Sequence, residues 1–340
     1  MPSRARVLVT GGAGYIGSHV VLRLTAAGHE VVVLDNLSAG HAWAVLEGEL
    51  VVADLADRER LEALLQERRF DAVMHFAASI WVGESMRDPV KYYTNNTANA
   101  LGLFAAAARH RVPLVVFSST AAVYGQPEVV DPIDEATPLA PINPYGSAKM
   151  MAERMLTDIA ATAGMRTAIL RYFNVAGADP AGRIGEATPD NSHLVKVACE
   201  VAMGLRERLV VNGTDYPTAD GTCIRDYIHV DDLAAAHVAA LDYLLDGGAP
   251  VVLNCGYGHG TSVREVLDTV AAVSGVDLPI AHGPRRPGDP ARLVAATDRI
   301  RRVLGWRPEH DDLRRIVESA WRWEQELARR RGERPQGGST

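Results

Sequence analysis

The seven residues Gly11–Gly17 constrain the fold of this chain more than any other stretch. They read Gly-Gly-Ala-Gly-Tyr-Ile-Gly and follow a short β-branched run, Arg6–Thr10, which is typical of a buried strand. A helical pattern over Tyr15–Ala27 begins inside the loop and stops at Gly28. Glycines let the backbone approach a ligand without Cβ clashes, and a helix N-terminus presents unpaired N–H groups to a phosphate. The order strand, loop, helix therefore predicts a pyrophosphate site.

A second strand pattern and an acidic residue strengthen this prediction. Glu30–Asp35 contains three consecutive valines, and Asp35 lies eighteen residues after Gly17. A carboxylate there can accept both hydroxyls of an adenosine ribose and repel a 2′-phosphate, so the pattern predicts NAD rather than NADP. A plain tight turn with Asp35 capping a strand is the weaker interpretation of the same residues. Asp54 ends a third expected strand, and its sequence context fits an adenine contact and a turn residue equally well.

Strand and helix patterns alternate through the first half of the chain. The expected strands are Arg6–Thr10, Glu30–Asp35, Val51–Asp54, Ala72–Phe76 and Leu114–Ser118, and the expected helices are Tyr15–Ala27, Arg58–Arg69 and Pro89–His110. Such alternation predicts right-handed βαβ units. The fold class is therefore α/β, a doubly wound parallel sheet of Rossmann type with ligands at the carboxyl ends of its strands.

The texture changes after about Val175, where Gly, Pro, Asp and Thr become frequent in long loops between apolar segments. We expect a cofactor-binding domain over residues 1–175, completed by returning segments from the second half. A smaller α/β substrate-binding domain over 176–330 should include a helix at Leu313–Arg329. Residues 331–340 are expected to form a disordered tail.

A tyrosine and a lysine stand one helical turn apart downstream. Asn143 suits the N-cap of a helix and Pro144 its first position, so Tyr145 and Lys149 should share a face. A nearby ammonium favours phenolate and should lower the pKa of the tyrosine, which could then take a hydroxyl proton as a hydride leaves carbon. Taken alone, such a pair is more often a surface pair. A dinucleotide site upstream favours the catalytic interpretation.

The segment Ser118–Thr120 ends an expected strand just before this pair. One of its hydroxyls could hydrogen-bond a substrate oxygen beside Tyr145. A turn in which the hydroxyls bond their own backbone is the competing interpretation, and the residues alone leave it open.

Composition excludes several classes of function. The net charge is -7, which argues against a nucleic-acid or anionic-membrane surface. No apolar run is long enough to span a membrane, and there is no room for a signal peptide before the first strand. The three cysteines have no metal-type spacing and the histidines are scattered, so we expect no metal site and reduced thiols in a cytoplasmic protein.

The chain resembles the extended short-chain dehydrogenase/reductases and, among them, the UDP-glucose 4-epimerases. The segments that carry the resemblance span nearly the whole chain in family order: GGAGYIGSH (Gly11–His19), DNLSAG (Asp35–Gly40), HFAA (His75–Ala78), VGESMRDPVKYYTNN (Val82–Asn96), SSTAAVYG (Ser118–Gly125), NPYGSAK (Asn143–Lys149), LRYFNVAGA (Leu170–Ala178), DGTCIRDYIHVDDLA (Asp220–Ala234) and RRPGDPA (Arg285–Ala291). The first half of this pattern is specific to the extended members, and LRYFN and DGTCIRDYIHV are specific to the epimerases.

The resemblance implies a role for each matching residue. The implied catalytic residues are Thr120, Tyr145 and Lys149. The implied NAD-binding residues are Gly11, Gly14, Tyr15, Ile16, Gly17, Asp35, Asn36, Asp54, Leu55, Phe76, Ala77, Asn95, Ser118, Tyr145, Lys149 and Phe173. The implied nucleotide-sugar contacts, which assign the domain over 176–330 to that ligand, are Thr120, Asn174, His193, Leu194, Arg225, Arg286 and Asp289. The two arginines could neutralise a diphosphate on an acidic protein, although without the resemblance a surface salt bridge is the simpler interpretation.

Three positions depart from the pattern. His193 stands where some epimerases have a second asparagine, and Asn212 stands where an aromatic residue often packs on uracil. Leu293 occupies the position that limits the pocket beyond the sugar, where other members have a bulky tyrosine or a small cysteine.

The implied activity is reversible C4 epimerisation of UDP-glucose and UDP-galactose through a 4-keto intermediate, with tightly bound NAD, in a homodimer. Related dehydratases carry Asp-Glu directly after the threonine, whereas this chain has Ala121 and Ala122, so it lacks an acid and base for elimination. A 4-epimerase of a UDP-N-acetylhexosamine, UDP-pentose or UDP-uronate stays open. A non-catalytic NAD sensor of the same fold is the alternative from another class, and it would not need Thr120, Tyr145 and Lys149 together.

Overall fold

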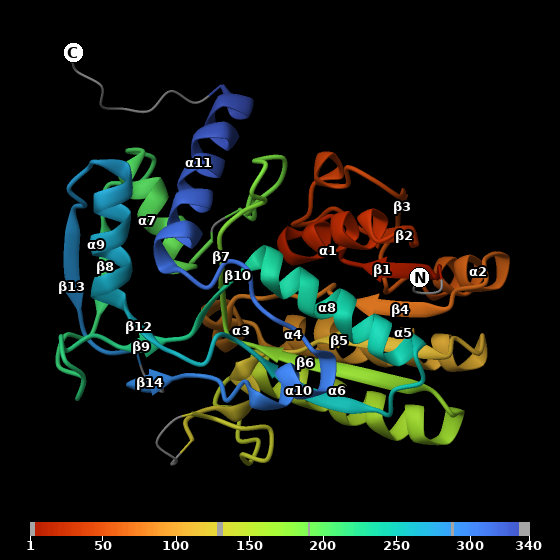
Figure 1. Cartoon of the computed structure of the whole chain (residues 1–340). Coiled ribbons are helices and arrows are strands. Elements are labelled where there is room, and N and C mark those ends of the chain that lie inside the picture. The colour runs from red at the N-terminus through yellow and green to blue at the C-terminus, as the bar shows by residue number, and fades with distance from the viewer. Residues whose placement is uncertain (1–3, 128–131, 190, 287–288, 333–340) are drawn as a thin grey trace.

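A seven-stranded parallel sheet forms the centre of the molecule (Figure 1). The computed structural model describes residues 4–127, 132–189, 191–286 and 289–332. From one edge to the other the strands are β3 (Glu49–Val52), β2 (Glu30–Asp35), β1 (Arg6–Thr10), β4 (Ala72–His75), β5 (Leu114–Ser118), β6 (Arg166–Tyr172) and β11 (Val251–Cys255). The order reverses between β1 and β4, as in a doubly wound sheet. The expected fold class is confirmed.

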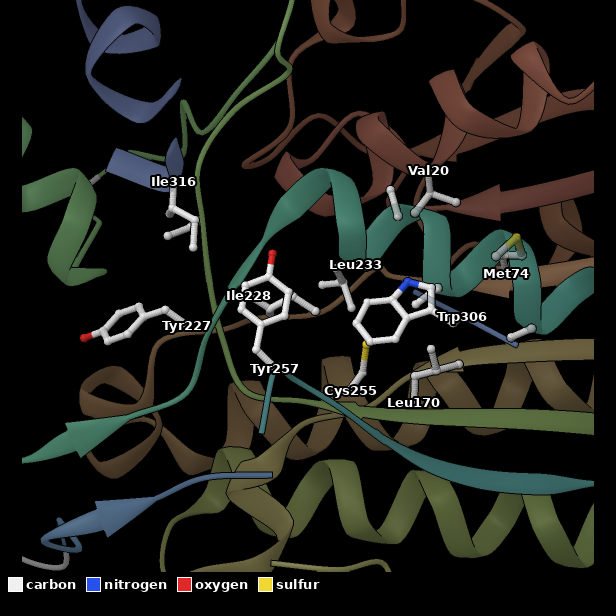
Figure 2. Packing of buried hydrophobic residues seen from close by; sticks show 14 of the residues in the cluster. Val20, Met74, Leu170, Tyr227, Ile228, Leu233, Cys255, Tyr257, Trp306 and Ile316 are labelled. Carbon is white, nitrogen blue, oxygen red and sulfur yellow. The ribbon is translucent and has the colours of Figure 1, made fainter. Parts of the chain in front are cut away.

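Strand residues alternate between two helical layers because successive side chains of a strand point to opposite faces. Val7 and Val9 of β1 belong to one buried cluster, whereas Leu8 belongs to another. The first layer contains α1 (Tyr15–Ala26) and α8 (Val230–Leu245), and the second contains α2 (Arg58–Glu67), α5 (Asn99–Arg109) and α6 (Pro144–Ala163). Figure 2 shows part of the first cluster, with Met74 and Leu170 of the sheet facing the same interior as Val20 of α1 and Leu233 of α8.

Residues after β6 build smaller sheets beside this core. β8 (Leu209–Asn212) pairs with β13 (Ile280–Gly283), β7 (Asn174–Ala176) pairs with β10 (Tyr227–His229), and β9 (Ile224–Arg225) lies between β12 (Thr261–Ser262) and β14 (Arg292–Leu293). The associated helices are α7 (Leu194–Ala202), α9 (Val263–Ser274), α10 (Asp298–Leu304) and α11 (Leu313–Arg331). In Figure 1, α7, α9 and α11 gather with β8 and β13 at one side of the large sheet. Because β11 returns to the large sheet, the second half of the chain also completes the first.

The region between β4 and β5 differs from the single helix expected over Pro89–His110. It contains α3 (Val82–Arg87), α4 (Pro89–Tyr92), a π-helical segment at Tyr93–Ala98 and then α5. In the π segment the Asn96 side chain accepts a hydrogen bond from the Ser79 N–H and donates one to the Ser79 carbonyl, both at 2.8 Å. These bonds hold the widened turn against the segment after β4, and π segments occur frequently at functional sites.

Two further boundaries correct the sequence prediction. β3 ends at Val52 because Glu49–Val52 pair with Val32–Asp35 of β2, so Asp54 lies two residues beyond the strand instead of ending it. The final helix continues through Arg331 and stops at Gly332 in the left-handed conformation, so these two residues are ordered rather than part of a tail. Residues 333–340 of the expected tail lie outside the described residues. Within the described part of the chain, no helix is long and apolar enough to cross a membrane.

Candidate active site

Parallel strands bring their carboxyl ends to one edge of the sheet, and most of the predicted cofactor residues lie there. Gly11 follows β1, Asp35 ends β2, Phe76 follows β4, Ser118 ends β5 and Phe173 follows β6. Residues separated by more than a hundred positions therefore share one edge, where doubly wound sheets bind their ligands.

The glycine loop is shaped by close backbone contacts. Gly11 has a φ of 75°, and a Cβ there would lie 2.4 Å from the backbone nitrogen of Ala77. A Cβ on Gly17 would lie 2.2 Å from the Gly11 carbonyl oxygen, whereas one on Gly14 would meet only that oxygen, at 3.3 Å. Gly11 and Gly17 are therefore required by the turn, whereas a side chain at Gly14 would have this one close neighbour. This cradle fits a pyrophosphate.

The first turn of α1 provides the positive end of that cradle. Its N-cap is Gly14, no side chain caps it, and its first turn contains no acidic residue. Tyr15 turns its phenol away, donating a 2.6 Å hydrogen bond to the Gly177 carbonyl, and Ile16 packs against the first hydrophobic cluster. The backbone N–H groups are left to an anion, in keeping with NAD as the ligand.

Asp35 is buried at the end of β2, and its carboxylate organises the loops around it. It accepts backbone hydrogen bonds from Ala13, at 2.9 Å, and from Leu37, at 2.8 Å. Leu37 has a φ of 58°, a strained conformation for a branched side chain that is typical of functional loops. Asn36 donates to Asp54 at 2.7 Å, so two further predicted adenosine contacts meet beside Asp35.

The other predicted cofactor residues lie on loops and on the π segment. The ring of Phe76 packs on His237 with centroids 4.8 Å apart, and Asn95 donates to the Ser79 hydroxyl at 3.0 Å. Leu55 is buried in the second hydrophobic cluster, so its side chain is part of the core. The Ser118 hydroxyl donates to the Tyr172 hydroxyl at 3.0 Å, and the Ser118 carbonyl accepts a hydrogen bond from Lys149.

Tyr145 and Thr120 come together between α6 and the loop after β5. Asn143 caps α6 as predicted, accepting from the Gly146 N–H at 2.8 Å, and Tyr145 is the second residue of the helix. Both Tyr145 and Thr120 are buried. Burial raises the pKa of Tyr145, and a hydrogen bond with the Thr120 hydroxyl partly opposes this rise. The arrangement places a phenol and a second hydroxyl around one position for a reacting oxygen.

Lys149 lies one helical turn further on and is also buried. Its ammonium donates to the Ser118 carbonyl at 2.9 Å and lies 4.9 Å from the centre of the Phe117 ring. Burial lowers the pKa of Lys149 to about 8, and Glu153 opposes this effect. We expected Lys149 to lower the pKa of Tyr145, but Lys149 is not among the groups that shift the pKa of this phenol. The reason is that the ammonium is directed at β5 rather than at the phenol.

Arg225 and Asp289, two predicted substrate contacts, form an ion pair. Arg225 also donates to the Ile224 carbonyl at 2.7 Å, and it is mostly buried. In the pairing of β9 with β14, Arg225 lies opposite Leu293. Arg286 is exposed, and its carbonyl accepts from the Asp289 N–H at 3.1 Å. One cation is thus held in an ion pair, and the second is exposed.

His193 and Leu194 begin α7. His193 is the N-cap, and its Nδ1 lies 2.6 Å from the buried carboxylate of Glu186, which raises the pKa of the imidazole against the effect of burial. Asn174 begins β7, where its N–H donates to the Asp226 carbonyl at 2.9 Å. Asn212 ends β8, and its side-chain amide donates to the Val210 carbonyl at 3.3 Å.

Sequence reasoning missed three buried residues that contact this site. The ring of Tyr92 meets that of Tyr145 edge-on, with centroids 6.4 Å apart. Glu153 lies one turn after Lys149 and pairs with Arg171 at 2.6 Å. The spacing of four between Lys149 and Glu153 was the available signal, but Arg171 is distant in sequence. No group of residues suited to a metal ion occurs in the parts of the chain that the structure describes.

Comparisons with known proteins show the family to which the chain belongs. The model of the NAD dependent epimerase/dehydratase family matches residues 7–256. UDP-glucose 4-epimerase of Azospirillum brasilense is 58% identical over 323 residues, covering 95% of this chain and 92% of the relative. UDP-arabinose 4-epimerase 1 of Arabidopsis thaliana is 44% identical, covering 95% of this chain and 80% of the relative.

A solved structure shows that the fold is shared as well. UDP-glucose 4-epimerase of Brucella ovis, crystallised in complex with NAD, superposes with a TM-score of 0.91 at 44% identity. The match covers 94% of this chain and 98% of that one. The chain belongs to the NAD dependent epimerase/dehydratase family, as a relative of its UDP-glucose 4-epimerases.

Proposed function

We propose that this protein interconverts UDP-glucose and UDP-galactose by reversible inversion at C4, with tightly bound NAD. The observation that carries the proposal is the meeting of Tyr145, Thr120 and Lys149 at the sheet edge that also holds the glycine loop. A non-catalytic sensor would not need this group. The names of the relatives support the same chemistry.

Each catalytic side chain has a distinct task. Tyr145 takes the proton of the 4-hydroxyl group, and Thr120 holds the C4 oxygen beside it. Lys149 binds the ribose next to the nicotinamide and keeps a positive charge at the site. Bound NAD supplies the acceptor and donor of the C4 hydride, so no second substrate is consumed. The 4-keto sugar must turn within the site to receive hydride on its other face.

The NAD-binding role is assigned to the glycine loop and the residues at the carboxyl ends of the strands. The set is Gly11, Gly14, Tyr15, Ile16, Gly17, Asp35, Asn36, Asp54, Leu55, Phe76, Ala77, Asn95, Ser118, Tyr145, Lys149 and Phe173. The uncapped N-terminus of α1 and the close backbone packing of the glycine loop support this assignment.

The nucleotide-sugar role is assigned to residues of the second half together with Thr120. The set is Thr120, Asn174, His193, Leu194, Arg225, Arg286 and Asp289. Guanidinium groups bind diphosphates with paired hydrogen bonds, and Asp289 keeps Arg225 oriented. We also assign cofactor binding to residues 1–175 with the returning segments, and nucleotide-sugar binding to residues 176–330.

A wider range of sugars is the second candidate, and Leu293 favours it. Leu293 packs with the cluster that contains Phe173 and Ala121. Ala121 belongs to the loop after β5, residues 119–125, which carries Thr120 and is called the catalytic loop below. It is smaller than tyrosine, so space can open beside the C2 substituent. We expect slower turnover of the N-acetylhexosamine pair than of the hexose pair, and Leu293→Tyr should widen the difference, since pocket volume discriminates by about 1–3 kcal/mol.

We further propose that the protein is a cytoplasmic homodimer. Large apolar side chains are exposed on neighbouring helices, including Val90 of α4, Leu101 of α5 and Met151 of α6. Helices α5 and α6 pack against each other, and exposed apolar side chains on neighbouring helices support an interface there.

Incubation with a panel of UDP-sugars, followed by chromatography of the products, tests the proposed activity. UDP-glucose should give UDP-galactose, and the reverse reaction should reach the same equilibrium ratio. Conversion of a UDP-pentose or UDP-uronate alone would move the activity to that sugar. Binding of NAD without conversion of any UDP-sugar would favour the sensor.

A further inference from the structure

A buried polar network lies directly behind the catalytic residues. Its centre is the carboxylate of Glu153, which is 4% exposed. Arg171 of β6 donates to it through Nε at 3.0 and 3.1 Å and through Nη2 at 2.6 Å. The Ser119 hydroxyl is a third donor to the same carboxylate. A buried charge with this many partners is held in one orientation.

The network continues from Arg171 to the end of the catalytic loop. Arg171 Nη1 donates to the Tyr124 hydroxyl at 3.1 Å, which donates to the Asn254 side chain at 2.7 Å. Asn254 in turn donates to the Ile133 carbonyl at 2.8 Å. The loop is therefore tied at Ser119 and at Tyr124, on both sides of Thr120.

Glu153 also faces Lys149, one turn earlier on α6. The other titratable and charged groups around Lys149 are His75 on β4 and Tyr145 on α6, with Arg171 beyond Glu153 on β6. Burial and the charge of Lys149 hold the pKa of His75 down to about 3, so this imidazole is neutral. Glu153 is the carboxylate that opposes the effect of burial on Lys149, and it pairs with Arg171 as well.

An ion pair that only neutralises Arg171 would need no contact with the catalytic loop. Here one carboxylate contacts Ser119, whose two neighbours are Ser118, the acceptor for Lys149, and Thr120, the partner of Tyr145. We propose that Glu153 is a positioning residue for the reaction proposed above. Its negative charge stabilises the ammonium of Lys149, and its hydrogen bond with Ser119 fixes the backbone that presents Thr120. The proposal rests on the proposed function only for its effect on turnover.

A titration of lysine signals tests the charge balance without an activity assay. The chain has three lysines, Lys91, Lys149 and Lys196, so carbon-13 labelling at their ε-methylene groups gives three NMR signals in the protein purified with its cofactor. In Glu153→Gln the Lys149 midpoint should fall by roughly 1–3 pH units, the usual effect of a close opposite charge. An unchanged Lys149 midpoint overturns the proposal.

Glu324→Gln is the matched control. Glu324 forms an equally buried ion pair, with Lys196 at 2.6 Å, on α11 and α7. This variant should lower the Lys196 midpoint and leave that of Lys149 in place. A shift of Lys149 in both variants would show a general loss of packing and contradict the specific role of Glu153.

Two variants keep the test decisive if Glu153→Gln does not fold because Arg171 is left unpaired. Glu153→Gln with Arg171→Gln removes both charges, and the Lys149 midpoint should fall by less than loss of the carboxylate alone would give, because loss of the Arg171 cation acts in the opposite direction. Ser119→Ala deletes one hydrogen bond and should lower kcat about tenfold or more at unchanged KM, as expected when a catalytic group is displaced. Wild-type kcat in Ser119→Ala overturns the positioning role, whereas an inactive wild type contradicts the proposed function and leaves the lysine titration valid.

Discussion

At the scale of single residues, the protonation of Tyr145 governs the proposed chemistry. Burial raises the pKa of the phenol, and its hydrogen bond with Thr120 acts in the opposite direction. A tyrosine that works as a base near neutral pH needs further help toward the phenolate. We propose that Lys149, one turn further along α6, supplies this help in the complex with cofactor and substrate.

Tyr145→Phe tests the identity of the base. The variant should keep the fold and bound NAD, because the ring still packs against Tyr92, but its kcat should fall about 10²–10⁴-fold. Steady-state assays with UDP-galactose measure the change, and the bound-cofactor content of the purified variant is the control. A variant that keeps more than about a tenth of the wild-type kcat would show that another group removes the proton.

Arg225→Ala tests the assignment of the diphosphate site. A charge-assisted hydrogen bond to substrate contributes on the order of 1.5–3 kcal/mol, so KM for the UDP-sugar should rise while NAD content stays constant. The variant also frees the Asp289 carboxylate from its ion pair, so that it can repel the substrate diphosphate. Asp289→Ala measured in parallel separates this repulsion from the loss of the Arg225 cation. Loss of NAD with an unchanged KM would move Arg225 to a structural role.

Prediction from sequence succeeded where a residue's neighbours in the chain determine its position. Asn143 caps α6 because it directly precedes a helix with proline at its first position. Glu153 and Arg171 were missed because their link depends on α6 packing against β6, and one sequence does not contain that distance. The prediction that Lys149 lowers the pKa of Tyr145 was wrong for the same reason. A spacing of four residues places both side chains on one face of the helix, but it does not place the ammonium beside the phenol.

At the scale of secondary-structure elements, the strands of the large sheet were the easiest to predict. β1, β2 and β5 have the expected bounds because each is a short β-branched run next to glycine, aspartate or serine. β3 was displaced because its end depends on pairing with β2. The short strands β7 and β9 have only a few residues each, and pairing across long sequence separations leaves no periodic signal.

The prediction on assembly concerns the exposed apolar side chains of α5 and α6. Leu101→Asp places a charge in the proposed interface and should shift the protein from dimer toward monomer. Light scattering coupled to size-exclusion chromatography gives the mass. Leu205→Asp is the control, because Leu205 is similarly exposed, 39% against 43%, but follows α7 on another part of the molecule. A monomeric wild type, or equal masses for both variants, would contradict the proposed interface.

At the scale of the whole molecule, buried histidines link stability to pH. Burial lowers the pKa of His75 and His229 to about 3, that of His237 to about 4, and that of His19 below its usual value. The unfolded chain binds these protons near pH 6.5, while the native protein does not. The stability contribution is therefore present above pH about 6.5 and is lost as the pH falls toward the folded values.

Urea unfolding at pH 7 and pH 5, at a fixed cofactor concentration, measures this effect. Stability should be lower at pH 5, with each proton adding up to about 1.4 kcal/mol per pH unit to the slope. His237→Leu should reduce the slope, because His237 is fully buried and its Nε2 has no partner among the described residues. An unchanged slope in His237→Leu would show that this imidazole is not held neutral.

In the proposed reaction one site removes hydride from C4 and returns it to the opposite face. The decisive measurement uses UDP-glucose with deuterium at C4 and the protein as purified, with no added cofactor. The product should be UDP-galactose that retains the deuterium at C4. Formation of UDP-galactose with hydrogen from water at C4, or no UDP-galactose at all, would contradict it.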